Sequence, residues 1–157
     1  MKKITPQYLK NSALYYLERY EASSQKLRTV LKRRLMKARQ EQLIPSEANV
    51  WVEQVVAEML RLGYVNDGRF AENAVRRLAE SGKSCSYIRT KLKLAGIKAE
   101  MIEAALSDTD ELAQARLMVK KKHLGTDFQR DLARLARAGF SYEIAKTALE
   151  EVSNVDL

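Results

Sequence analysis

The side chains in this sequence that are best suited to binding a partner are basic, and they are concentrated in its first third. The chain of 157 residues contains 28 Lys and Arg against 20 Asp and Glu, a formal net charge of +8. Residues 1–43 hold 11 basic and 3 acidic groups, so their excess equals that of the whole chain. A surface of this kind favours an anionic partner, either nucleic acid or an acidic protein surface.

Seven cations form the candidate partner-binding set: Arg28, Lys32, Arg33, Lys37, Arg39, Arg89 and Lys93. At 100° per residue, Arg28 and Lys32 lie on one flank of an apolar helical stripe. Arg89 and Lys93 hold the same angular relation to a second stripe, 61 residues later. Any single Lys or Arg on a helix is often only a solvated helix former. The recurrence favours a positive track shared by two stacked units.

Residues suited to catalysis or metal binding are scarce. Cys85 is the single cysteine, and it shares a stripe with Ile88 and Leu92, where a thiol acts as a small hydrophobe. His123 is the single histidine, and its position near a predicted helix end favours a packing or dipole-facing role. Zinc sites usually need three or four Cys and His ligands. No enzyme activity, metal or cofactor is expected.

The elements that must position these side chains are predicted to be helices. Apolar residues recur at three- and four-residue spacing, and Gly and Pro stand between the periodic segments. No alternating strand pattern occurs, so the fold class is all-α with about nine helices and no sheet. Capping-box spacing predicts helix starts at Asp108 and Thr126. Tyr8, Tyr15 and Tyr16 are expected to pack along the first helix rather than stack on bases.

The chain also repeats itself. Ser84–Lys93 echoes Ser23–Lys32 at a shift of 61, and Ala95-Gly96 recurs 43 positions later as Ala138-Gly139. We expect a single modular protein built as an elongated, curved array of three tandem three-helix repeats. The predicted repeats span about 5–64, 65–107 and 108–153.

A group of motifs then resembles a known family. Leu62–Ala71 reads Leu-Gly-Tyr-Val-Asn-Asp-Gly-Arg-Phe-Ala. Together with Ala13–Tyr20, Ser23–Leu35 and Gly82-Lys83, this segment is similar to the RecX family of bacterial recombination regulators. The resemblance covers roughly residues 8–150. Its motif positions, taken as structural, are Gly63, Tyr64, Asn66, Asp67, Phe70, Ala71, Gly82, Ile88, Leu92 and Gly96.

The resemblance implies a curved protein of tandem three-helix repeats that binds RecA recombinase filaments on DNA. Members of the family lie in the filament groove and limit filament growth, strand exchange and coprotease activity in recombination, DNA repair and the SOS response. The expected partners are therefore the RecA filament and single- or double-stranded DNA. The single cysteine and the lack of a long apolar run predict a cytoplasmic protein with no membrane contact. A monomer is expected.

Two other functions remain open from the residues. One is a sequence-independent nucleic-acid-binding module that acts without RecA, in which Cys85–Leu106 forms a helix-turn-helix. Its reading segment, 98–106, offers acidic and apolar groups instead of Arg, Asn or Gln. The other is an enzyme that depends on Cys85.

Overall fold

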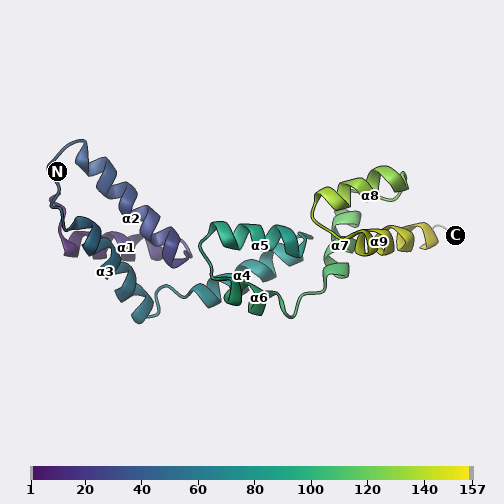
Figure 1. The fold of residues 1–157 in the computed structure, drawn as a ribbon, viewed down its shortest axis with the longest axis horizontal. Helices are drawn as coiled ribbons and strands as arrows, with labels where there is room; N and C mark the ends of the chain where they lie inside the picture. The colour runs from purple at the N-terminus through teal and green to yellow at the C-terminus, as the bar shows by residue number, and fades with distance from the viewer. Residues whose placement is uncertain (1, 156–157) are drawn as a thin grey trace. The chain divides into compact units, whose positions relative to one another are not determined.

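The computed structural model describes residues 2–155, which fold into helices and connecting turns without a strand (Figure 1). Within these residues there are nine helices, which confirms the predicted all-α class. Their bounds are α1 (Pro6–Leu17), α2 (Ser24–Arg39), α3 (Ala48–Arg61), α4 (Asp67–Glu80), α5 (Cys85–Leu94), α6 (Ala99–Leu106), α7 (Glu111–Lys121), α8 (Phe128–Arg137) and α9 (Tyr142–Val155).

Most helix starts are fixed by side-chain caps, whereas α3 and α6 have none. Thr5 precedes α1, and its hydroxyl accepts a hydrogen bond from the Tyr8 amide at 3.1 Å. Pro6 occupies the first helical position, where its missing N–H costs least. Asn66 serves α4 in the same way by accepting from the Arg69 amide at 3.0 Å.

Two predicted helix starts were wrong. The cap of α7 is Asp110, which accepts from the Ala113 amide at 3.1 Å, and not Asp108. The cap of α8 is Asp127, which accepts from Arg130, and not Thr126. In both places an aspartate nearer the first turn reaches the unpaired amides that the capping-box residue was expected to satisfy.

The described chain divides into two compact units. The first comprises the chain up to Phe70 together with Ala95–Ile97. Within it α3 packs against both α1 and α2. The apolar stripes of the three helices meet in one core, which includes Leu9, Ala13, Leu27, Leu31, Leu35, Val52, Val56 and Met59.

The second unit comprises Ala71–Leu94 and the chain from Lys98 onward. Here α5 packs on α6, and α9 packs on both α7 and α8. The α7–α9 core includes Ala115, Val119, Leu124, Leu135, Phe140, Ala145, Ala148 and Leu149.

Each unit contains the same serine–carbonyl hydrogen bond between residues far apart in the sequence. In the first unit the Ser23 hydroxyl donates to the Ala95 carbonyl at 2.7 Å. In the second unit the Ser84 hydroxyl donates to the Ala138 carbonyl, also at 2.7 Å. Both serines are at most 1% exposed. Each hydroxyl also accepts the amide that starts its own helix, so one buried group serves both as a helix cap and as a donor.

A glycine follows each accepting carbonyl because the backbone there has a positive φ and lies against the serine segment. The φ angles are +79° at Gly96 and +100° at Gly139. A Cβ at Gly96 would overlap the Gln25 side chain, and one at Gly139 would press on Ser84 and Ser86. The recurrence of Ala-Gly after 43 residues therefore reflects a close backbone approach that only glycine allows.

A carboxylate reinforces each serine segment. Asp67, the first residue of α4, accepts from both the amide and the hydroxyl of Ser24 at 2.7 Å. Glu111, the first residue of α7, accepts from the Cys85 amide at 3.2 Å. Since Ser24 and Cys85 are 61 residues apart, the two donors occupy matching positions in the sequence repeat, and each acceptor is the first residue of a helix.

The tyrosine prediction was right for two residues and wrong for the third. Tyr8 and Tyr16 are partly buried and pack against the core of the first unit. Tyr15 is 55% exposed, and the Arg19 guanidinium lies over its ring, 3.8 Å from the centroid.

We expect Gly139→Ala to lower the free energy of unfolding by about 1–3 kcal/mol, because the Cβ would be strained at positive φ and would press on Ser84. Gly68→Ala is the matched control, since Gly68 lies in the first turn of α4 without a positive φ. That control should be neutral or stabilising by up to about 1 kcal/mol. Urea unfolding followed by circular dichroism measures both. Equal stabilities for the two variants would contradict the role assigned to Gly139.

Candidate partner-binding surface

The basic residues of α2 project from a helix that is held by one buried stripe. Leu27, Leu31 and Leu35 are at most 1% exposed and fix the rotation of α2 about its axis. The Ser23 hydroxyl accepts the Lys26 amide at 3.1 Å and sets the start of the helix. The intervening cations are therefore held at the rim of the core or in solvent.

Arg28 and Lys32 already have an acidic neighbour inside the protein. The Arg28 Nε lies 2.8 Å and 2.9 Å from the two carboxylate oxygens of Glu53 on α3. The Lys32 Nζ lies 3.8 Å from the same carboxylate. This flank of α2 is thus a mixed-charge surface, with its positive potential reduced by Glu53.

The other predicted cations of α2 are available to a partner. Arg33, Lys37 and Arg39 are exposed, and among residues 2–155 none of them forms an ion pair. Exposed cations without internal partners keep their charge free for a partner's carboxylates or phosphates. The side of α2 with Arg33 and Lys37 is therefore the stronger candidate contact.

The second unit holds the other predicted pair. The Arg89 Nε donates to Glu103 on α6 at 2.6 Å, with a second contact at 3.3 Å. This hydrogen bond holds the pKa of the Glu103 carboxyl below its ordinary value and raises that of Arg89. Lys93 is exposed and has no ion pair within the described chain. In this pair, Lys93 is the free charge.

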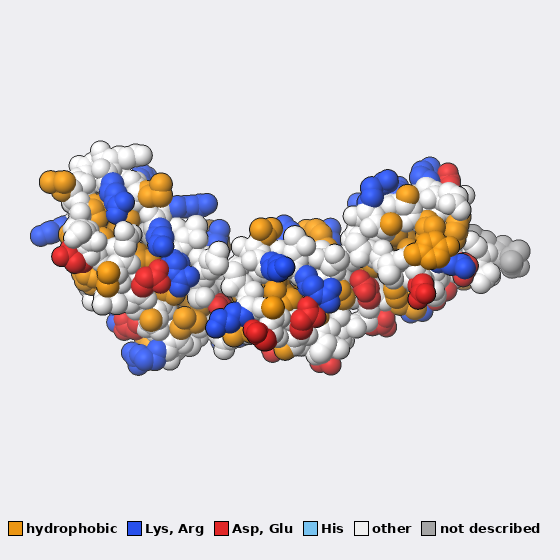
Figure 2. Space-filling model, in the orientation of Figure 1, with side chains coloured by type: hydrophobic (Ala, Val, Ile, Leu, Met, Phe, Trp, Pro, Cys, Tyr) orange, Lys and Arg blue, Asp and Glu red, His pale blue; other side chains and the backbone are white. Residues whose placement is uncertain are grey.

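An arginine on the second helix bound to a glutamate on the third is thus common to the α1–α3 and α4–α6 segments. Figure 2 shows the result, with blue cationic side chains beside red carboxylates on both parts of the surface. The alignment of the α2 and α5 cations into one track stays a prediction, because the two groups belong to separate compact units.

Sequence reasoning missed the glutamates that pair with these arginines. Glu53 lies 25 residues after Arg28, whereas Glu103 lies only 14 residues after Arg89. The repeat comparison could not align them, because the first repeat has a longer middle. The available signal was an exposed glutamate on the polar face of each third helix.

The family-motif residues lie at helix ends and in the cores. Gly63 and Gly82 have φ of +79° and +84° and end the turns after α3 and α4. Ala71, Ile88 and Leu92 are at most 1% exposed. Phe70 is half-buried and Tyr64 is 56% exposed. Three motif residues make contacts described above. Asn66 caps α4, Asp67 accepts from Ser24, and Gly96 lies against Gln25.

The surroundings of Cys85 and His123, the residues best suited to catalysis, do not form a catalytic arrangement. Cys85 is buried, with its sulfur 3.4 Å from the Thr109 hydroxyl and 3.9 Å from Gln114. Of the two roles predicted for His123, packing was wrong, because the residue is exposed. His123 lies just beyond the end of α7 with a φ of 53°, and the dipole-facing role stays a prediction. Among residues 2–155 no cluster of three His, Cys, Asp or Glu is placed to bind a metal ion.

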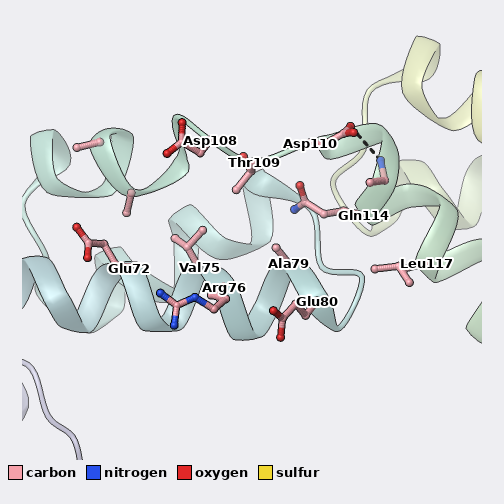
Figure 3. A pocket seen from close by; sticks show the side chains of 13 residues that line it. Glu72, Val75, Arg76, Ala79, Glu80, Asp108, Thr109, Asp110, Gln114 and Leu117 are labelled. Atoms are coloured by element: carbon pink, nitrogen blue, oxygen red, sulfur yellow. Dashed lines mark hydrogen bonds between the residues drawn. The ribbon is translucent and has the colours of Figure 1, made fainter.

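A groove of about 560 Å³ lies between α4, α6 and α7 in the second unit (Figure 3). Its lining includes small apolar side chains such as Ala79 and Ala113. It also includes four carboxylates: Glu72, Glu80, Asp108 and Asp110. Asp110 is engaged in capping α7, as the dashed line in the figure shows. The lining contains no histidine or cysteine that could act as a nucleophile or base.

None of the helices within the described residues combines the length and the apolar character that a membrane span requires.

Comparison with known proteins identifies the family. A model of the second three-helix domain of RecX matches residues 66–106, which contain α4–α6. A "Regulatory protein RecX" of Myxococcus xanthus is 38% identical over 164 residues, covering 95% of this chain and 88% of that protein. The chain belongs to the RecX family.

Further comparisons agree with this assignment. The "Regulatory protein RecX" of Agrobacterium fabrum is 31% identical over 148 residues and covers 87% of this chain and 79% of its own length. The crystal structure of RecX from Lactobacillus salivarius shares the fold with a TM-score of 0.73 at 20% identity, covering 94% of this chain and 96% of that one. A second RecX crystal structure gives a TM-score of 0.72 at 18% identity. The RecX resemblance predicted from the motifs is confirmed, and the family is one of regulatory proteins.

We expect the Glu103 carboxyl of this RecX-family protein to titrate below the ordinary glutamate pKa of about 4.3, because the charged form accepts from Arg89. A depressed pKa means that the contact is present above the folded-state pKa and is lost as the pH falls through it. Carboxyl-detected NMR titration measures this pKa.

In Arg89→Gln the pKa of Glu103 should return to the ordinary value. Arg116→Gln is the control, because Arg116 lowers the pKa of Glu151 through an equivalent contact and leaves Glu103 untouched. An ordinary pKa for Glu103 in the unmodified protein would show that the contact does not persist in solution.

Proposed function

We propose that this protein is a non-enzymatic regulator that binds RecA nucleoprotein filaments on DNA and limits RecA activity. The activities limited are filament extension, strand exchange and coprotease function, in recombination, DNA repair and the SOS response. The observation that supports this best is the 38% identity to a RecX protein over 95% of the chain. The proposal places the protein in the cytoplasm as a monomer without a cofactor.

The arrangement of charge offers a physical basis for filament binding. One group of cations lies on α2 in the first compact unit and another on α5 in the second. A filament repeats the same surface on every protomer, so one regulator with two cationic groups would engage acidic groups on neighbouring protomers. Two linked contacts raise the affinity well beyond that of either contact alone.

In this proposal the protein inhibits RecA by binding to the filament and not by catalysing a reaction. A protein that bridges neighbouring protomers obstructs the groove in which strand exchange takes place, or it destabilises the addition of a further protomer at the filament end. The acidic RecA surface would meet the cations of the candidate set, with Arg33, Lys37 and Lys93 as the charges that are free of internal ion pairs.

We expect substoichiometric amounts of this protein to inhibit RecA strand exchange and single-stranded-DNA-dependent ATPase activity. Blocking a growing end or bridging protomers affects many RecA molecules for each regulator bound. The measurement is a titration from low to equimolar ratios. Full RecA activity across that range would refute the proposed function.

We expect Arg33→Glu/Lys37→Glu to raise the concentration needed for half-maximal inhibition by about tenfold and to weaken its salt dependence. These residues test the surface better than Arg28 and Lys32, because a glutamate at position 28 would face Glu53 and disturb α2 and α3 themselves. Strand exchange at two salt concentrations measures the effect.

The charge-matched control is Lys98→Glu/Lys120→Glu, which changes two exposed lysines outside the candidate set. This control should inhibit like the unmodified protein. If both double variants lose inhibition equally, α2 contributes only net charge and is not the contact surface.

A further inference from the structure

A second cationic feature lies in the second unit, away from the candidate partner-binding set. A pocket of about 310 Å³ is enclosed by the turn after α4, the first turn of α5 and the C-terminal ends of α7 and α8. Its lining contains four cations, Lys83, Lys121, Lys122 and Arg137, and no carboxylate. The side-chain oxygens in the lining belong to Ser81, Ser84 and Tyr87.

The four cations are not neutralised by acidic neighbours. Among residues 2–155 none of them forms an ion pair. Lys121 is held at the pocket, since its Nζ donates to the Ser81 carbonyl at 3.1 Å. Lys83 lies over the Tyr87 ring, with its Nζ 5.0 Å from the centroid. Two of the positive groups are therefore positioned by contacts that leave their charge available.

The helix ends do not account for the whole cluster. The C-terminal ends of α7 and α8 carry about half a negative charge each, which explains why lysine and arginine are favourable there. Four full positive charges exceed this, and the N-terminus of α5 at Ser84 adds a further positive potential. The pocket therefore has a strong net preference for an anion.

The number of the charges favours a nucleic-acid strand. Its phosphates follow one another closely, with about one negative charge per 3.4 Å of helix axis on each strand of DNA. Cations from three separate segments that converge on one small cavity can contact successive phosphates, whereas an isolated carboxylate would leave most of them unpaired. Lys, Arg, Tyr and Ser side chains are the groups that proteins use for phosphate contacts.

We infer that this pocket binds the phosphate backbone of DNA, through Lys83, Lys121, Lys122 and Arg137. The contact is made without base recognition and is independent of RecA. It adds a DNA contact in the second unit to the protein-binding surface proposed above.

The test compares two double variants of the full chain in binding a fluorescein-labelled oligo(dT) by fluorescence anisotropy without RecA. Lys83→Gln/Arg137→Gln removes two pocket cations, and Lys98→Gln/Arg134→Gln removes the same charge from exposed positions outside the pocket. All four side chains are exposed, and unfolding midpoints confirm that both variants fold.

The pocket variant should bind about tenfold more weakly, and its plot of log affinity against log salt should be shallower by about 1.4, for two lost phosphate contacts on a single strand. The control should change by less than about twofold. Equal weakening in both variants, no weakening in the pocket variant, or no binding of oligo(dT) by the unmodified protein at low salt would each overturn the inference.

A RecA strand-exchange assay with the same variants separates this inference from the proposed function. If the pocket variant binds oligo(dT) normally but no longer inhibits RecA, the pocket contacts protein and the DNA assignment is wrong, while the proposed function stands. If it binds oligo(dT) weakly and still inhibits RecA, both proposals are supported.

Discussion

The fold depends on a buried serine hydroxyl that donates to the carbonyl before a glycine. At Ser23 and Ala95, and again at Ser84 and Ala138, this bond joins backbone segments that are 72 and 54 residues apart. A buried hydroxyl that loses its partner costs about 1–3 kcal/mol, and the glycine is needed because a side chain would occupy the serine segment's space. The serine hydroxyl, the accepting carbonyl and the following glycine thus account together for a helix cap, a close contact and part of the internal sequence repeat.

The serine–carbonyl hydrogen bonds leave the polar faces of α2 and α5 exposed. The cations on these faces therefore either pair with a neighbouring carboxylate or remain unpaired. Where a third helix lies alongside, its glutamate neutralises the arginine that faces it, as with Glu53 and Glu103. Exposed pairs of this kind contribute little to the free energy of folding, so they orient side chains more than they stabilise the fold. Cations with no carboxylate alongside, such as Arg33 and Lys37, keep their charge for a partner. The internal ion pairs therefore divide the basic surface into a part where carboxylates neutralise the cations and a part where the cations keep their charge.

The helices could be predicted from the sequence because their signals are local: apolar spacing, and glycine or proline between segments. The caps at Asp110 and Asp127 were missed because several polar residues stand within one turn and only the backbone path decides among them. The repeats could be recognised in the sequence, but the serine–carbonyl hydrogen bonds could not. Each of these bonds joins a serine that recurs after 61 residues to an alanine that recurs after 43. At the surface, the cations were evident while their glutamate partners were not. The pocket cations Lys121 and Lys122 were missed because lysines at the end of a helix are already explained by its dipole.

The serine position has a third counterpart with a different chemistry. Asp127 lies 43 residues after Ser84 and caps α8 by accepting from the Arg130 amide at 3.2 Å. A serine hydroxyl can accept from its own helix and donate to a neighbour at once, whereas an ionised carboxylate has no hydrogen to give. Aspartate at position 127 therefore keeps the helix start, but it cannot donate the hydrogen bond that Ser23 and Ser84 each make to a distant carbonyl.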